Sequence, residues 1–473
     1  MTDAVTEAAN SPDPSSGAHA YRKWQIRIFS ATWVAYAGYY FCRKAFYVVK
    51  ADLGTSLGLS TMDLANLGTA YLVSYMVGQF SSAFFGKILG PKKLLLTGMG
   101  ASIVANLAFG FSNSYWTVME FMVLNGLAQG TGWPGCIGSL AFWFRRKQRG
   151  TVLGFWSTCY QLGSVAATSF AAFMLGWQGW RWSFFGATMV LGVIWLAVFS
   201  LHPNRPKDVG LEPLDDPDSG ESSQEQDLET FGQDASATGD TTQLPNTNSN
   251  TSGTERDGAG GSHFDRWLTG LGWNRRVLTT IVMMGLIYFS IKFLRYSLWS
   301  WVPYFFHRNY HTTGAEAGYL STVFDISGFV GVLFAGFVSD RLFRGHRAGL
   351  SLIMLAMMTL GFAGLYLAGL AGVGYFVVGL GWVGFALYGP DSLLSGVGAI
   401  DVGSKKGALT AAGIINGMGS AGPIVQEEVI AFLYDRYDGS LLPVFGLLLA
   451  VAVLGTMVTA ALWFRSRGGK TRL

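Results

Sequence analysis

The stretch Tyr39-Tyr40-Phe41-Cys42-Arg43-Lys44-Ala45-Phe46 decides how this chain folds. It lies inside an apolar and aromatic segment, residues 24–49, that is long enough to cross a bilayer as a helix. A charged side chain at the centre of such a helix costs about 2.5–3.5 kcal/mol on insertion scales, so it is expected to face protein or a water-filled cavity. Arg43 therefore predicts a membrane helix that borders a polar pathway.

A second arginine has a comparable place in the other half of the chain. Arg295 lies in Ile291-Lys292-Phe293-Leu294-Arg295-Tyr296-Ser297-Leu298-Trp299, again inside an apolar run. A single arginine near a helix end can extend its guanidinium into the lipid headgroups while its stem stays buried. The occurrence of a matched pair argues against that reading, and we predict that the two arginines together hold an anion.

The composition predicts an all-α integral membrane protein and excludes a soluble globular one. The chain of 473 residues is 50% hydrophobic and only 13% charged, and its apolar runs repeatedly reach membrane-spanning length. We expect about twelve spans, at residues 24–49, 64–85, 94–111, 116–144, 152–175, 182–201, 277–306, 314–338, 349–370, 372–397, 408–434 and 442–464.

The halves are separated by a polar segment, and Asp, Glu, Ser, Thr, Gly, Asn and Gln dominate residues 212–262. Such a composition is typical of disorder. We expect a disordered tail (1–21), a six-helix bundle (22–203), a largely disordered linker (204–275), a second bundle (276–465) and a short tail (466–473). Lys and Arg gather in alternate loops, which places both termini and the linker in the cytoplasm. We expect the membrane to be a plasma membrane, such as a bacterial inner membrane.

An internal repeat relates the two halves. Gly132-Trp133-Pro134-Gly135 corresponds to Tyr388-Gly389-Pro390-Asp391, and each is followed by a basic loop. The spacing from Pro134 to Gly163 equals that from Pro390 to Gly419. A repeated helix-loop-helix unit gives this pattern.

Several stretches carry a more specific signal in the right order. They are residues 39–44, residues 125–134 (Asn-Gly-Leu-Ala-Gln-Gly-Thr-Gly-Trp-Pro), residues 206–211 (Pro-Lys-Asp-Val-Gly-Leu), residues 293–296, and residues 405–407 with 410–413. Outside the tails and the linker, the chain resembles the organophosphate:phosphate antiporters of the major facilitator superfamily, which exchange glycerol 3-phosphate or hexose 6-phosphate.

The resemblance implies a twelve-helix major facilitator fold, with two pseudo-symmetric six-helix bundles around a central cavity. It implies that the substrate phosphate lies between Arg43 and Arg295, and that the protein exchanges a phosphate-bearing small molecule for inorganic phosphate. A guanidinium suits this role because it stays charged and can grip phosphate oxygens bidentately. We expect no enzymatic activity, cofactor, metal or nucleic-acid partner, and a monomer in the bilayer.

Further candidate substrate-binding residues surround the arginines. Lys44 and Tyr39 belong to the first motif. The alternative to a binding role is pairing with a helix-end carbonyl or a lipid headgroup for Lys44, and packing for Tyr39. Bacterial members of the family carry a lysine and a histidine at the positions that align with Gln79 and Tyr160, so the identity of the ester is open. Lys292 lies one helical turn before Arg295, and we hypothesise that it restores the cation missing at Gln79.

Acidic residues in the spans have other expected roles. We expect Asp325 to pair with a cation of the second bundle, and Asp340-Arg341 to form a gating turn at a helix end. Glu427 and Glu428 would lie at the outer interface, or in the cavity, where they would balance positive charge or bind a proton. Two other functions stay open: a proton-coupled or facilitative carrier of another organic anion, and a non-transporting sugar-phosphate sensor.

Overall fold

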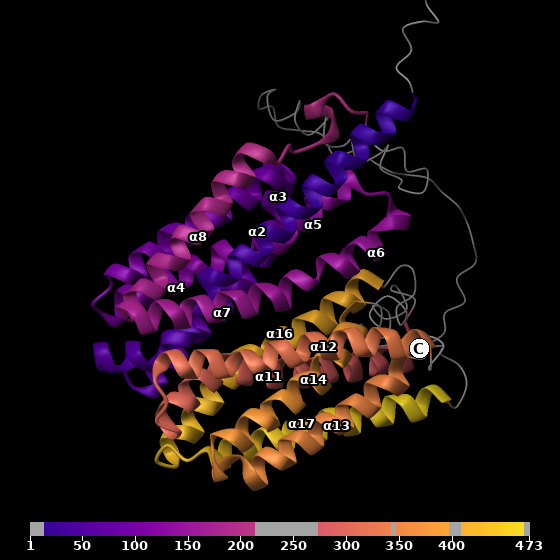
Figure 1. Ribbon diagram of the computed structural model, residues 1–473. Coiled ribbons are helices and arrows are strands. Elements are labelled where there is room, and N and C mark those ends of the chain that lie inside the picture. The colour runs from indigo at the N-terminus through magenta and orange to yellow at the C-terminus, as the bar shows by residue number, and fades with distance from the viewer. Residues whose placement is uncertain (1–13, 213–272, 342–346, 397–407, 468–473) are drawn as a thin grey trace, which may run out of the picture.

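The computed structural model describes residues 14–212, 273–341, 347–396 and 408–467, which contain helices and no strand. The helices form two bundles (Figure 1). The first bundle comprises α2 (Pro14–Leu57), α3 (Thr61–Phe111), α4 (Tyr115–Gln129), α5 (Gly132–Trp143), α6 (Arg146–Trp156), α7 (Thr158–Gln178) and α8 (Trp180–Leu201), followed by the 3-10 helix η2 (Pro206–Val209). The second comprises α11 (Arg275–Asn309), α12 (Gly314–Arg341), α13 (Arg347–Ala368), the 3-10 helix η3 (Gly369–Ala371), α14 (Val373–Gly396), α16 (Ala408–Arg436) and α17 (Leu441–Arg467).

These helices account for the expected spans once their breaks are considered. The second and third spans form the single element α3, which is kinked at Gly90, where φ is 73° and Pro91 follows. Glycine adopts this φ without strain. The fourth span is divided into α4 and α5, and the fifth into α6 and α7. Among the described residues, seven helices are long and apolar enough to cross a membrane by length and composition alone. Of the others, α4, α5 and α6 are shorter than a full span, with 15, 12 and 11 residues.

The first helix is longer than the sequence predicted. We expected a disordered tail up to residue 21, but α2 begins at Pro14. The rings of Tyr21 and Trp24 lie 5.9 Å and 6.0 Å from that of Trp143, and Gln25 Nε2 donates to the Trp143 carbonyl at 2.8 Å. These contacts with α5 anchor the extension. Most of the predicted linker, and the basic loop at 405–407, lie outside the described residues.

The bundles join near one end of their helices. In Figure 1 they converge on the side opposite the C-terminus. Contacts run between α3 and α16, α7 and α12, and α2 and α11. At Gly68 on α3, an added Cβ would lie 3.0 Å from Glu427 Cδ on α16, so a small residue permits this close approach. The junction involves the C-terminal halves of α2 and α11, and therefore lies away from the side where α2 begins and α17 ends.

Candidate functional site

Arg43 on α2 is buried, with 7% of its surface exposed, and is held by a neutral partner. Its Nε donates to Gln129 Oε1 on α4 at 3.0 Å. Gln129 is itself oriented, because its Nε2 donates to the Tyr39 carbonyl and to Ser102 Oγ, each at 3.1 Å. In the part of the chain that the structure describes, no carboxylate pairs with Arg43, and its buried Nη2 has no hydrogen-bond partner. This guanidinium thus keeps donor capacity for an anion.

Arg295 on α11 is held by a charged partner instead. Its Nη1 forms an ion pair with Asp391 Oδ2 on α14 at 2.6 Å, and its guanidinium carbon lies 4.6 Å from the centre of the Tyr388 ring. The side chains of Arg295 and Asp391 are 22% and 11% exposed. Lys292, one turn earlier, donates to Asn416 Oδ1 at 3.3 Å. The second bundle therefore contributes two cations to this region, one of them neutralised.

Contacts across the junction connect the surroundings of the two arginines. Lys44 follows Arg43 on α2, and its Nζ lies 3.5 Å from Asp325 Oδ2. Asp325 accepts a hydrogen bond from the Tyr388 hydroxyl, and the Tyr388 ring centre lies 4.6 Å from the Arg295 guanidinium carbon. Arg43 and Arg295 therefore border the same chain of contacts between the bundles.

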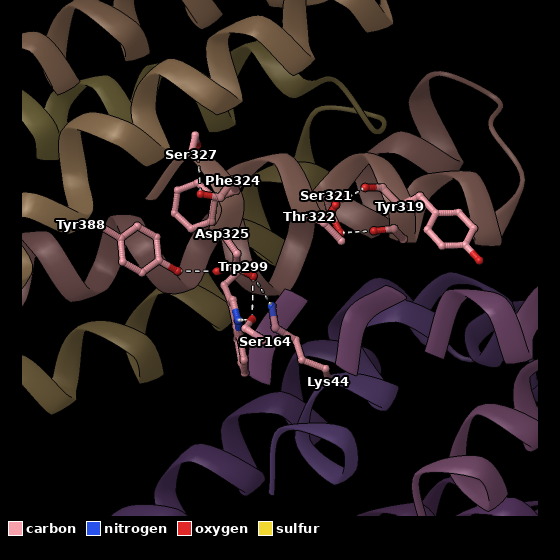
Figure 2. Close-up of polar contacts among 11 residues, drawn as sticks. Lys44, Ser164, Trp299, Tyr319, Ser321, Thr322, Phe324, Asp325, Ser327 and Tyr388 are labelled. Carbon is pink, nitrogen blue, oxygen red and sulfur yellow. Dashed lines mark hydrogen bonds and ion pairs between the residues drawn. The ribbon is translucent and has the colours of Figure 1, made fainter. Parts of the chain in front are cut away.

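Lys44 crosses to the second bundle (Figure 2). Its Nζ lies 3.5 Å from Asp325 Oδ2 on α12 and 3.9 Å from the centre of the Trp299 ring. Ser164 on α7 donates to Asp325 Oδ2 at 2.6 Å, and the Tyr388 hydroxyl donates to Oδ1. The expectation that Asp325 pairs with a cation of its own bundle was wrong. Asp325 lies on the face of α12 that packs against the first bundle, so its cation comes from α2.

A second ion pair crosses the junction. Lys50 Nζ on α2 lies 3.0 Å from Glu427 Oε2 on α16 and 3.3 Å from the centre of the Trp301 ring; neither charged side chain is exposed. Ser300 also donates to Glu427. Glu427 is fully buried in the contact between the bundles, as the counter-charge of Lys50, and so lies in neither of the two places expected, the outer interface or the cavity.

The neighbouring Glu428 also contacts the first bundle. Its Oε1 accepts a hydrogen bond from Thr69 Oγ1 on α3 at 2.6 Å. Sequence reasoning missed Lys50 because the first apolar segment was ended at residue 49. Its spacing of about two helical turns from Arg43, on the same helix face, was the available signal.

Two other predicted site residues, Tyr39 and Gln79, form hydrogen bonds with neighbours of Arg43 or within the first bundle. The buried Tyr39 hydroxyl bridges α3 and Thr131: it lies 3.2 Å from the Leu95 carbonyl and 3.2 Å from Thr131 Oγ1, so it packs within the first bundle. Gln79 Nε2 donates at 3.0 Å to the hydroxyl of Tyr75, whose ring centre lies 5.1 Å from the Arg43 guanidinium carbon.

The last predicted site residues are Tyr160 and the gating turn Asp340-Arg341. Tyr160 accepts a hydrogen bond from Trp133 Nε1 at 3.0 Å. Arg341 stacks its guanidinium 4.6 Å from the centre of the Phe337 ring. The side chain of Asp340 and residues 342–346 lie outside the described part of the chain, so the gating role of Asp340-Arg341 stays a prediction.

Comparisons with known proteins agree with this architecture. The chain is 27% identical over 414 residues to a probable hexose phosphate transport protein of Chlamydia pneumoniae (83% of this chain, 81% of the relative). It is 26% identical over 482 residues to a putative glycerol-3-phosphate transporter 2 of Arabidopsis thaliana (94% and 88%), and 27% identical over 400 residues to the membrane sensor protein UhpC of Salmonella typhimurium (84% and 82%).

A solved structure shares the fold, and a sequence profile identifies the family. The crystal structure of a bacterial homologue of the human lysosomal transporter Spinster, inward-facing and unoccupied, superposes with a TM-score of 0.64 at 14% identity, over 94% of this chain and 97% of that chain. The profile of the Major Facilitator Superfamily matches residues 32–427. The chain is therefore a multi-pass membrane protein that belongs to the Major Facilitator Superfamily.

Proposed function

We propose that this protein exchanges an organophosphate, such as a sugar phosphate or glycerol phosphate, for inorganic phosphate by alternating access. The observation that carries the proposal is Arg43: a buried guanidinium with an unpartnered Nη2, next to Lys44, which contacts Asp325 beside the Tyr388 ring that lies against Arg295. Leaving such a charge without an anion is costly, whereas a phosphate can satisfy both guanidinium groups bidentately. The names of the relatives support the same class of cargo.

The charge balance of the region supports a divalent anion. Its basic groups are Arg43, Lys44, Lys292 and Arg295, and its carboxylates are Asp325 and Asp391. Two positive charges are left without a negative partner. A phosphate monoester carries a charge of about −1.5 to −2 at pH 7, so it would balance them.

The placement of the arginines supports exchange. Each arginine belongs to a different bundle, so an anion between them would draw the bundles together, whereas the excess positive charge of the empty site opposes closure. Return without cargo is thereby disfavoured. We further propose that the protein lies in the plasma membrane with both termini in the cytoplasm. The described state then opens toward the cytoplasm, and the protein works as a monomer.

Flux measurements test the proposal. Purified full-length protein is placed in liposomes loaded with phosphate, and uptake of labelled phosphate is measured in competition with glucose 6-phosphate and glycerol 3-phosphate. We expect uptake that needs internal phosphate and falls with either ester. Arg43→Lys should abolish it, and Arg465→Lys, at an exposed position near the end of α17, should not.

A second function, sensing of sugar phosphates without transport, is favoured by the similarity to the sensor UhpC. It predicts binding of a phosphate ester with no flux in the same liposomes. A requirement for a pH gradient would instead indicate a proton-coupled carrier of an organic anion. Either result would replace the exchange mechanism.

A further inference from the structure

Asp391 places a negative charge inside a site that is otherwise built to hold an anion. Its Oδ2 lies 2.6 Å from Arg295 Nη1, close enough for a strong charge-assisted hydrogen bond. One of the two guanidinium groups proposed to grip the cargo is thus already neutralised by the protein. A phosphate that binds Arg295 must compete with this carboxylate.

The Arg295–Asp391 ion pair packs against the Tyr388 ring on one side and is partly exposed to solvent on the other. Helix α14 supplies both Asp391 and Tyr388, whose ring lies against the Arg295 guanidinium. Arg295 and Asp391 are 22% and 11% exposed, whereas the Lys50–Glu427 pair is fully buried. Solutes can therefore reach the first pair, and its partners can change.

A second cation is available to a displaced Asp391. Lys292 lies one turn before Arg295 on the same helix, α11. Among the described residues, its Nζ contacts the amide oxygen of Asn416 at 3.3 Å and the face of the Tyr288 ring at 4.5 Å, and no carboxylate. A carboxylate that leaves Arg295 therefore finds an unneutralised ammonium nearby.

We propose that Asp391 is a built-in competitor that makes the site selective for doubly charged phosphate. This inference rests on the proposed function. A monoanion replaces the Asp391 carboxylate on Arg295 with an equal charge, so it gains little there, even when the displaced carboxylate turns to Lys292. A dianion gains more from the two arginines and can drive the exchange. Phosphate monoesters are thus accepted, and phosphate diesters and monocarboxylates are rejected.

The test compares ligands that differ in charge. Exchange of labelled phosphate is inhibited with methyl phosphate, which can be a dianion, and with dimethyl phosphate, which is a monoanion. In the unaltered protein we expect methyl phosphate to inhibit far better. In Asp391→Asn, which keeps the shape and removes the charge, dimethyl phosphate should inhibit about tenfold better, and the gap should narrow. Asp435→Asn, exposed near the far end of α16, is the matched control.

The pH profile gives a second readout. A phosphate monoester gains its second negative charge with a pKa of about 6. Inhibition by glycerol 3-phosphate should therefore strengthen from pH 5 to pH 7.5 in the unaltered protein, and less steeply in Asp391→Asn. A purely structural role of Asp391 would not change this slope. Asp391→Ser, smaller and neutral, serves if the asparagine variant does not fold.

The outcomes separate the two proposals. Suppose that the unaltered protein exchanges phosphate, and that Asp391→Asn and Asp391→Ser prefer methyl phosphate over dimethyl phosphate as strongly as the unaltered protein does. The role proposed for Asp391 is then wrong, and the proposed function stands. If Asp391→Asn weakens all ligands equally, as loss of Arg295 would, the carboxylate only positions the arginine, and the inference is again overturned. If the unaltered protein neither binds nor moves phosphate, both fail.

Discussion

The two bundles share a helical plan but divide their charges unequally. In the first bundle, α2 supplies Arg43, Lys44 and Lys50, and none of them has a carboxylate partner in the described part of that bundle. The second bundle supplies the carboxylates, and two lysines of α2 cross the junction to reach them. An internal repeat can thus preserve the backbone while electrostatic attraction between unlike halves holds the bundles together.

The contrast is sharpest at the two arginines. Arg43 is oriented by the amide of Gln129, and Arg295 by the carboxylate of Asp391. An anion that binds Arg43 displaces no charged group, whereas one that binds Arg295 must replace Asp391. Arg43 is therefore expected to contribute more to affinity for cargo.

The largest effect should come from breaking the buried ion pair between the bundles. Lys50→Met leaves Glu427 buried without its counter-charge, which costs about 3–5 kcal/mol. The contact between the two bundles around Glu427 should then separate more often and become accessible from the outer side of the membrane. The measurement uses Val48→Cys, at a buried position of the junction beside Gly318, and the rate of its reaction with an impermeant thiol reagent; the native cysteines are buried. An unchanged rate would contradict the prediction, and Lys23→Met, exposed on the same helix, is the control.

Arg43→Lys should have the next largest effect. A lysine cannot reproduce the planar, bidentate grip of the guanidinium, and we expect a loss of about 100-fold in phosphate affinity, or about 3 kcal/mol. Arg295→Lys should lower phosphate affinity by only about tenfold, because a phosphate that binds Arg295 must also displace Asp391. Calorimetric titration with phosphate checks both. Equal losses would refute the asymmetry.

A smaller effect should follow from making the first half resemble the second. Gln129→Glu gives Arg43 a carboxylate partner like that of Arg295, and phosphate affinity should fall about tenfold. The same titration measures it. Gln129→Met, which removes the hydrogen bond but adds no charge, separates neutralisation of Arg43 from loss of its orientation; if both variants lose affinity equally, orientation alone is responsible.

The smallest change concerns Lys292. It contacts an amide and an aromatic face, and its charge lies beside the site, so Lys292→Ala should weaken phosphate binding by about 1 kcal/mol or less. Affinity that does not change at all would discard the hypothesis that Lys292 replaces a cation missing at Gln79. Arg465→Ala, exposed on α17, controls for net charge.

The sequence predicted the fold well because the spans are encoded locally. Apolar length placed the membrane segments, and the kink at Gly90-Pro91 and the division after Gln129 are local features. The partners of the charged residues depend on packing between distant helices. Asp325 was assigned to the right helix and the wrong partner, because spacing does not reveal which bundle a helix face meets.

Two site residues were missed for similar reasons. Lys50 lies just beyond the apolar run that defined the first span. Asp391 was noticed only as part of a repeated turn, since its pairing with Arg295 requires α14 to pack beside α11. Motif spacing therefore locates the cations, and the structure is needed to find what balances them.

A carrier that is open to one compartment must still insulate the membrane. The Lys50–Glu427 pair, flanked by Trp301 and inaccessible to solvent, supplies a dry plug on the closed side. Because the two charges neutralise each other within the protein, this contact does not attract a hydrated ion. We therefore expect the protein without substrate to conduct no ionic leak current.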